Sequence, residues 1–112
     1  MKQWDTSQWN FPHGFPHGPH PGVSLSPDAR CQNPAFETVN ILAGQSHRAQ
    51  RPANALECLL YAEDGMKWET LVRCDFIWVA IKSELTQRRG AVTFDRRRDM
   101  GRKVISVLDL YL

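Results

Sequence analysis

Short segments with strand character follow one another at close spacing, and turn signals separate them. The clearest is 37–45, where Val39, Ile41 and Ala43 share one face of an alternating pattern. A chain of 112 residues has apolar content for only one core. The sequence therefore predicts a single domain, residues 1–112, whose compact sheet curls into a small barrel. The predicted strands are 4–11, 23–26, 37–45, 55–61, 69–74 and 76–82.

Pro and Gly residues mark the main interruptions between these strands. Residues 12–22 are so rich in Pro, Gly and His that they predict a loop without regular structure. Asp64-Gly65 is a strong hairpin signal between 55–61 and 69–74. Cys74-Asp75 interrupts the apolar run that follows, so 69–82 is either two strands or one strand with a bend or bulge.

The last segment changes from strand to helical spacing. Thr93 can cap a helix that starts at Phe94 and runs to about residue 110. Its predicted apolar face contains Phe94, Gly101, Val104, Ile105, Leu108 and Tyr111 or Leu112. Three arginines, Arg96 to Arg98, oppose the helix dipole in the first turns, so either packing compensates for them or they serve another purpose. The fold class is therefore mainly β, with a C-terminal α-helix.

Charge and cysteine content limit the function classes. Residues 82–103 carry eight basic and three acidic side chains, an asymmetry that favours a polyanionic partner such as RNA or else forms a solvated helix face. Three widely spaced cysteines suggest neither a disulfide framework nor a zinc site; Cys58 and Cys74 are expected to be buried thiols. With no membrane-length apolar run and no signal peptide, we expect a cytoplasmic protein without a membrane partner.

The candidate chemistry lies in histidines and in one polar patch. His13, His17 and His20 cluster in the 12–22 loop, either as a metal site or, more simply, as single histidines that transfer protons or contact RNA. A polar patch follows the 37–45 strand, where arginine can clamp a phosphate, serine can hydrogen-bond it and histidine can move a proton. The patch contains Gln45, Ser46, His47, Arg48 and Arg51.

Several common enzyme signatures are missing from the sequence. There is no G-x-G-x-x-G, no phosphate-binding G-x-x-x-x-G-K-S/T, no H-E-x-x-H and no G-x-S-x-G. These absences argue against dinucleotide enzymes, metalloproteases and α/β-hydrolases, and no cofactor or metal is expected. RNA cleavage by its own 2′-hydroxyl needs only a base and an anion-binding group, and the residues above could supply both.

The order of segments resembles the PemK/MazF-like toxins of bacterial toxin–antitoxin systems over nearly the whole chain, and residues 68–112 match best. The resemblance implies an SH3-like or CcdB-like β-barrel closed by the C-terminal helix. It also implies a homodimer, metal-independent cleavage of single-stranded RNA, and a cognate antitoxin that covers the RNA groove. The segments that carry it are the aromatic strand 9–11, GPHPGVSLS, TVNIL, WETLVRCDFIW, KSEL and RRGAVTFDRR.

The same resemblance implies two catalytic positions. The family's catalytic arginine precedes a proline at the start of the second strand, where this chain has His20 before Pro21. A second position, Thr or Ser at the end of the third strand, falls near Gln45 and Ser46, and Ser46 has the suitable chemistry. Either His20 takes over proton transfer while Arg48 or Arg51 supplies charge, or the fold persists with altered or lost cleavage. The alternative function is a non-catalytic binding module or protein poison, in the way that CcdB engages gyrase.

Overall fold

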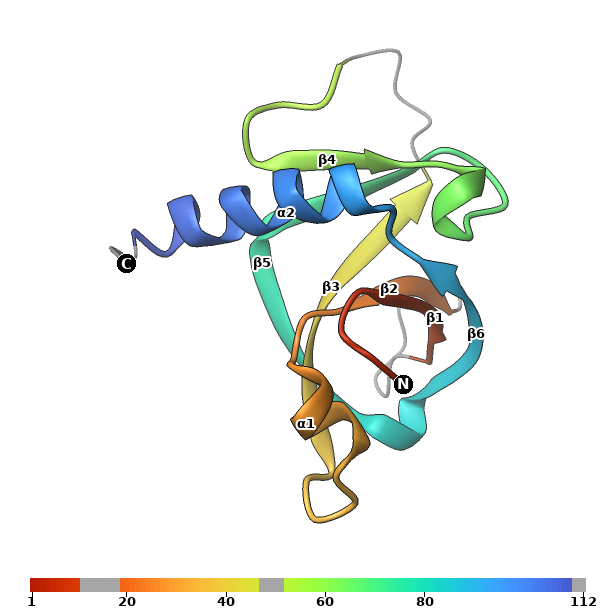
Figure 1. Cartoon of the computed structure of the whole chain (residues 1–112). Coiled ribbons are helices and arrows are strands. Elements are labelled where there is room, and N and C mark those ends of the chain that lie inside the picture. Colours follow the sequence, from red (N-terminus) through yellow and green to blue (C-terminus); the bar gives the residue numbers. More distant parts are fainter. Residues whose placement is uncertain (11–18, 47–51, 110–112) are drawn as a thin grey trace.

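Six antiparallel strands and one long helix make up most of the computed structural model, which describes residues 1–10, 19–46 and 52–109. Figure 1 shows the strands curling around a core, with the C-terminal helix packed across one side. The strands are β1 Asp5–Trp9, β2 His20–Ser24, β3 Thr38–Ser46, β4 Glu57–Leu60, β5 Thr70–Ile81 and β6 Leu85–Ala91. The helices are α1 Asp28–Gln32, η1 Ala62–Asp64, η2 Lys82–Glu84 and α2 Phe94–Val107, where η denotes a 3-10 helix.

The sheet is strongly curled but remains open. Its strand order is β4-β5-β3-β2-β1-β6, so β4 and β6 are its two edges. η1 packs against β6, and α2 packs over β4 and β5, so these two elements cover the gap between the edges (Figure 1). The predicted mainly-β fold with a covering C-terminal helix is therefore confirmed, with helices rather than strand pairing completing the barrel.

β5 is a single long strand with a bend in its middle. Leu42 of β3 pairs with Ile77, but Gly44, two residues later, pairs with Val72, so β5 contributes extra residues at this point. The beginning of β5 also pairs with β4, through Glu57 and Arg73. One bent strand, rather than two strands, is therefore the correct form of the 69–82 segment, and the bend includes the predicted position at Cys74-Asp75.

The two faces of β3 are both buried, each in a different apolar cluster. Leu42 packs with residues under α2, and Ile41 packs with Trp9 on the opposite face. The larger cluster contains Val23, Leu42, Cys58, Leu60, Met66, Val72, Cys74, Val92 and Met100. The smaller contains Trp9, Cys31, Val39, Ile41 and Ala80. The cysteines are unpaired and buried, as predicted for Cys58 and Cys74.

α2 packs against the core through only part of the face predicted. Met100 is fully buried and Val104 lies against the core, but Phe94 is 76% exposed and Leu108 is 49% exposed. The predicted burial of Phe94 was therefore wrong, because contact with β4 and β5 turns Met100 rather than Phe94 toward the core. Thr93 does occupy the N-cap position, although its side chain makes no cap hydrogen bond.

The predicted loop 12–22 ends earlier than expected. β2 begins at His20 and includes Pro21, because these residues pair with Trp9 and Gln8 of β1. β2 also pairs with β3 on its other edge, and that pairing begins at Gly22. Pro21 has no backbone N–H, but it lies outside this pairing, so no hydrogen bond between β2 and β3 is lost. Strand pairing across the sheet thus overrides the local Pro and Gly signal.

One strand and one α-helix were not predicted from the sequence, nor were the two 3-10 helices. β6, with the sequence LTQRRGA, has no alternating apolar pattern because it is an edge strand, whose one partner among the described strands is β1. α1 is a single short helix within a turn-rich segment, and the Nζ of Lys82 donates to the carbonyls of Arg30 and Asn33 at its C-terminal end. No helix in the described ranges has the length and apolarity required to span a bilayer.

Candidate functional site

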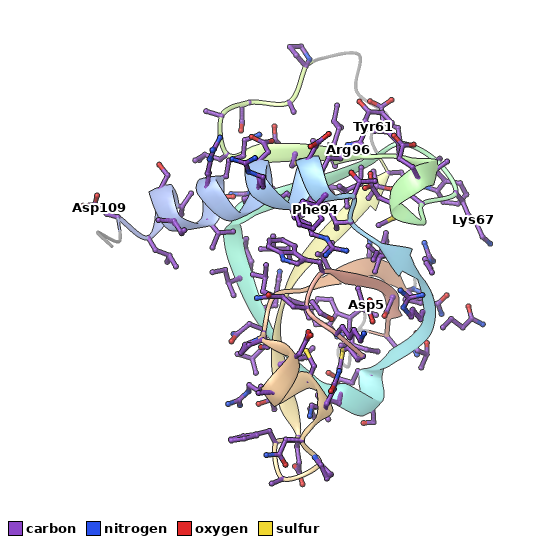
Figure 2. All side chains as sticks on the ribbon, viewed as in Figure 1. Asp5, Tyr61, Lys67, Phe94, Arg96 and Asp109 are labelled. Carbon is purple, nitrogen blue, oxygen red and sulfur yellow. The ribbon has the colours of Figure 1, made fainter. Side chains whose placement is uncertain are left out.

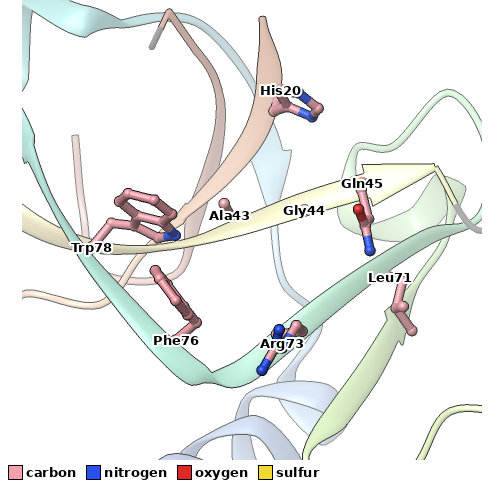
Figure 3. Close-up of a pocket in the computed structure, with 8 residues that line it drawn as sticks. All are labelled: His20, Ala43, Gly44, Gln45, Leu71, Arg73, Phe76 and Trp78. Carbon is pink, nitrogen blue, oxygen red and sulfur yellow. The ribbon is translucent and has the colours of Figure 1, made fainter. Parts of the chain in front are cut away.

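A small open pocket of about 220 Å³ lies where β2, β3 and the bend of β5 meet (Figure 3). One of its walls is aromatic and the others carry polar and cationic groups. The bend of β5 opens this space, because it separates the end of β3 from the second half of β5. The lining residues are His20, Ala43, Gly44, Gln45, Leu71, Arg73, Phe76 and Trp78.

His20 is the imidazole of the pocket. It is the first residue of β2, pairs across the sheet with Trp9, and is half-buried. Because its backbone belongs to the sheet, its side chain is positioned by strand geometry rather than by a loop. Figure 3 shows it on one side of β3, with Arg73 on the other side of the pocket. The residue singled out by the sequence as a catalytic candidate therefore lines the pocket.

Gln45 and Ser46 end β3 but are differently placed. Gln45 lines the pocket, with Ala43 two residues before it on the same face of the strand. Ser46 is half-buried, and strand alternation directs its side chain to the opposite face; it is not among the pocket-lining residues. The structure thus brings His20 and Gln45 together in one pocket and leaves Ser46 beside it.

Arg73 is the cationic group of the pocket, and sequence reasoning did not select it. Its Nε and Nη2 donate to the two carboxylate oxygens of Asp75 at 3.1 and 2.8 Å, which fixes the guanidinium on the wall. The hydrogen bond from Arg73 lowers the pKa of the Asp75 carboxyl. The signal available in the sequence was a pair of charges inside an otherwise apolar strand.

Phe76 and Trp78 form the aromatic wall. Their ring centroids are 4.5 Å apart and their planes are tilted by 39°. Trp78 also meets buried Trp9 edge-on at 5.6 Å, so it is held from behind by the core. Phe76 is 44% exposed, and the guanidinium of Arg73 lies 5.9 Å from its ring centroid.

His17, His47, Arg48 and Arg51 lie outside the described residues, as does His13, so the metal-site alternative for the histidine loop stays a prediction. The described pocket combines an imidazole, a guanidinium and an amide with an exposed aromatic surface. In chemical terms, an imidazole can move a proton, and a guanidinium beside an aromatic ring can bind a nucleic acid strand.

Known structures with this fold are similar to the chain over its whole length. By sequence, the chain matches no protein-family model and no curated protein. By structure, it is similar to an endoribonuclease in complex with its cognate antitoxin from a mycobacterial species, with a TM-score of 0.80, 17% identity, and coverage of 100% of this chain and 98% of the other.

Two further structures extend the comparison. The Mycobacterium tuberculosis toxin MazF-mt6 has a TM-score of 0.77 and 14% identity, with coverage of 96% of this chain and 99% of the other. A chain of MazE-MazF from Deinococcus radiodurans has a TM-score of 0.76 and 20% identity, with coverage of 99% and 98%. The chain therefore has the MazF fold that the order of its segments implied.

Proposed function

We propose that this chain is an endoribonuclease toxin of a toxin–antitoxin system and that it cleaves single-stranded RNA. The observation that carries the proposal is the presence of His20 and Arg73 in one pocket of a MazF fold. A base and a fixed cation beside an aromatic surface suit the cleavage of a phosphodiester next to an unpaired base.

The reaction uses the RNA's own 2′-hydroxyl as the nucleophile. His20 accepts the proton of this hydroxyl, and the 2′-oxygen then forms a bond to the adjacent phosphorus. The bond from phosphorus to the 5′-oxygen breaks, and protonated His20 gives the proton back to that oxygen, which leaves as a 5′-hydroxyl. The other product carries a 2′,3′-cyclic phosphate, so neither water nor an external nucleophile enters this step.

Arg73 stabilises the negative charge that develops on the phosphoryl oxygens. Its bonds to Asp75 hold the guanidinium in place before substrate arrives, which lowers the cost of orienting it in the transition state. Gln45 contributes an amide that can hydrogen-bond a phosphate or a base. Ser46 remains a second candidate contact, and His17, His47, Arg48 and Arg51 remain candidate RNA ligands.

The proposal includes two protein partners. Chains with this fold are known in complexes with an antitoxin, as in the mycobacterial and Deinococcus structures. We propose that a cognate antitoxin covers the pocket of this chain and blocks RNA, and that two copies of the chain form a homodimer. An RNA strand longer than one nucleotide needs more surface than this pocket, and a second subunit would provide it.

Digestion of single-stranded RNA with end-group analysis tests the proposal. The purified protein should cut RNA in excess chelator and leave 2′,3′-cyclic phosphate and 5′-hydroxyl ends. Intact RNA with folded protein, together with growth arrest on expression, would contradict it and favour a non-catalytic protein poison instead. This alternative needs a test because His20 occupies the position where the resemblance leads us to expect the catalytic arginine.

A further inference from the structure

The aromatic wall of the pocket exposes a ring where the core does not require one. Phe76, on β5, is 44% exposed. By contrast, apolar side chains of the adjacent strand β3 are buried on both of its faces. The partner of Phe76, Trp78, is braced by an edge-on contact with buried Trp9, so the core supports the pair. An exposed, braced aromatic pair inside a concave site is a binding feature rather than a packing feature.

We propose that Phe76 and Trp78 seat one unpaired nucleobase next to the phosphate that the pocket binds, an inference that rests on the proposed ribonuclease function. Successive bases stack on aromatic side chains in proteins that bind single strands, because every base has a flat π face. The guanidinium of Arg73, 5.9 Å from the Phe76 ring, places an N–H-rich cation beside this seat, held there by Asp75. A base on Phe76 would therefore have its own phosphate within the cationic part of the pocket.

The size of the pocket favours a single base. Sites for drug-sized ligands occupy roughly 300–1,000 Å³, whereas this pocket has about 220 Å³. It is open on one side, so a strand can pass over it while one base enters. A base that is paired in a duplex presents its edge to the groove and keeps its faces stacked, so it cannot use this seat. The seat thus explains how the site would select single strands.

Binding of two uncleavable oligonucleotides of equal charge tests this seat. One is a fluorescein-labelled 2′-O-methyl oligoadenylate, which lacks the nucleophile, and the other is the same backbone with every base removed. The wild-type chain should bind the base-bearing oligonucleotide more tightly. In Phe76→Leu this preference should shrink by about 5- to 150-fold, the range that loss of one stacked base produces. Affinity for the abasic oligonucleotide should stay as in the wild type.

Two further variants test whether the loss of base preference is specific to the aromatic face of Phe76. Phe76→Trp keeps a π face and should retain the preference for bases. Phe36→Leu is the matched control, because Phe36 is 43% exposed and also lies against an arginine, Arg30 at 4.5 Å, but away from the pocket. It should leave both affinities unchanged.

The outcomes separate the seat from the proposed function. An equal loss of affinity for both oligonucleotides in Phe76→Leu, or no loss at all, would overturn the seat, as would loss of the base preference in Phe76→Trp. RNA cleavage by a protein whose base preference survives Phe76→Leu leaves the function standing without the seat. A base preference that depends on Phe76 in a protein that cuts no RNA supports the seat and counts against the nuclease.

Discussion

Arg96, in the first turn of α2, donates from Nη1 to the buried carboxylate of Asp64 at 2.8 Å. Its Nη2 donates to Glu63 at 2.9 Å, and its guanidinium lies over the ring of Tyr61 at 4.7 Å (Figure 2). Burial disfavours the charged guanidinium, but the hydrogen bond to Glu63 and the charge of Asp64 outweigh this and raise the pKa of Arg96. An arginine that opposes the helix dipole is thus explained, because it joins α2 to the connection between β4 and β5.

Asp64→Ala should destabilise the protein by about 3–5 kcal/mol, the cost of removing one partner of a buried ion pair. Asp64 is fully buried and also accepts hydrogen bonds from the backbone N–H groups of Tyr61 and Thr93. Glu63→Gln is the matched control, because it changes the other carboxylate that Arg96 contacts; Glu63 is 54% exposed, so this variant should lose far less stability than Asp64→Ala. Urea unfolding measures both, and equal midpoints would contradict the role given to Asp64.

Gly65→Ala should be strongly destabilising, whereas Gly101→Ala should be tolerated. Gly65 has a φ of +88°, and an added Cβ would lie 2.7 Å from the backbone oxygen of Arg89. Backbone strain alone costs about 1–3 kcal/mol, and the clash adds to it. At Gly101 the nearest atoms belong to Trp4 at 3.9 Å, so alanine should gain about 0.5–1 kcal/mol from helix propensity. Thermal unfolding of the two variants should shift in opposite directions.

Stability should fall in alkaline solution because of two buried thiols. Burial raises the pKa of Cys74 from 9.0 to about 12 and that of Cys58 to about 11. Between pH 9 and the folded-state pKa of each thiol, the unfolded chain loses a proton that the folded chain keeps. The contribution of the two thiols to the free energy of unfolding is therefore fully present below about pH 9 and declines as the pH rises. The slope is on the order of 1 kcal/mol per pH unit for each thiol.

Cys74→Ala isolates that effect from the lysines that titrate in the same range. The variant should be less stable than the wild type at neutral pH, but its stability should decline less steeply between pH 9 and 11. Urea unfolding at several pH values gives both slopes. Identical slopes would show that Cys74 ionises as readily in the folded chain as in the unfolded one.

His20→Ala and Arg73→Gln should each lower the rate of RNA cleavage while the protein stays folded. Loss of the base is expected to cost about 10²- to 10⁴-fold. Loss of the charge that stabilises the transition state is expected to cost about 10²- to 10³-fold. Arg102→Gln, on the exposed side of α2, is the control and should leave the rate near that of the wild type. Undiminished cleavage by His20→Ala would assign the base to another residue, and Ser46→Ala shows whether Ser46 takes part.

The local pattern of apolar and polar residues was sufficient to predict most of the strands and the long helix. The alternation of Val39, Ile41 and Ala43 marks β3, and the change to helical spacing after Thr93 marks α2. These features are visible because side-chain burial repeats with the period of the element that carries it. β6 was not predicted because an edge strand need not have an apolar face, and its sequence therefore lacks the alternating pattern. The exposed Phe94 shows that a helical pattern does not by itself identify which face packs.

Sequence patterns were enough to predict the mainly-β class with a C-terminal helix, the burial of Cys58 and Cys74, and His20 as a candidate site residue. That Arg73 and Phe76 share a pocket with His20 follows from the three-dimensional arrangement of the strands. The reason is that β2, β3 and β5 become neighbours through pairing between distant segments. Such pairing depends on the packing of the whole sheet, which no local stretch of sequence encodes.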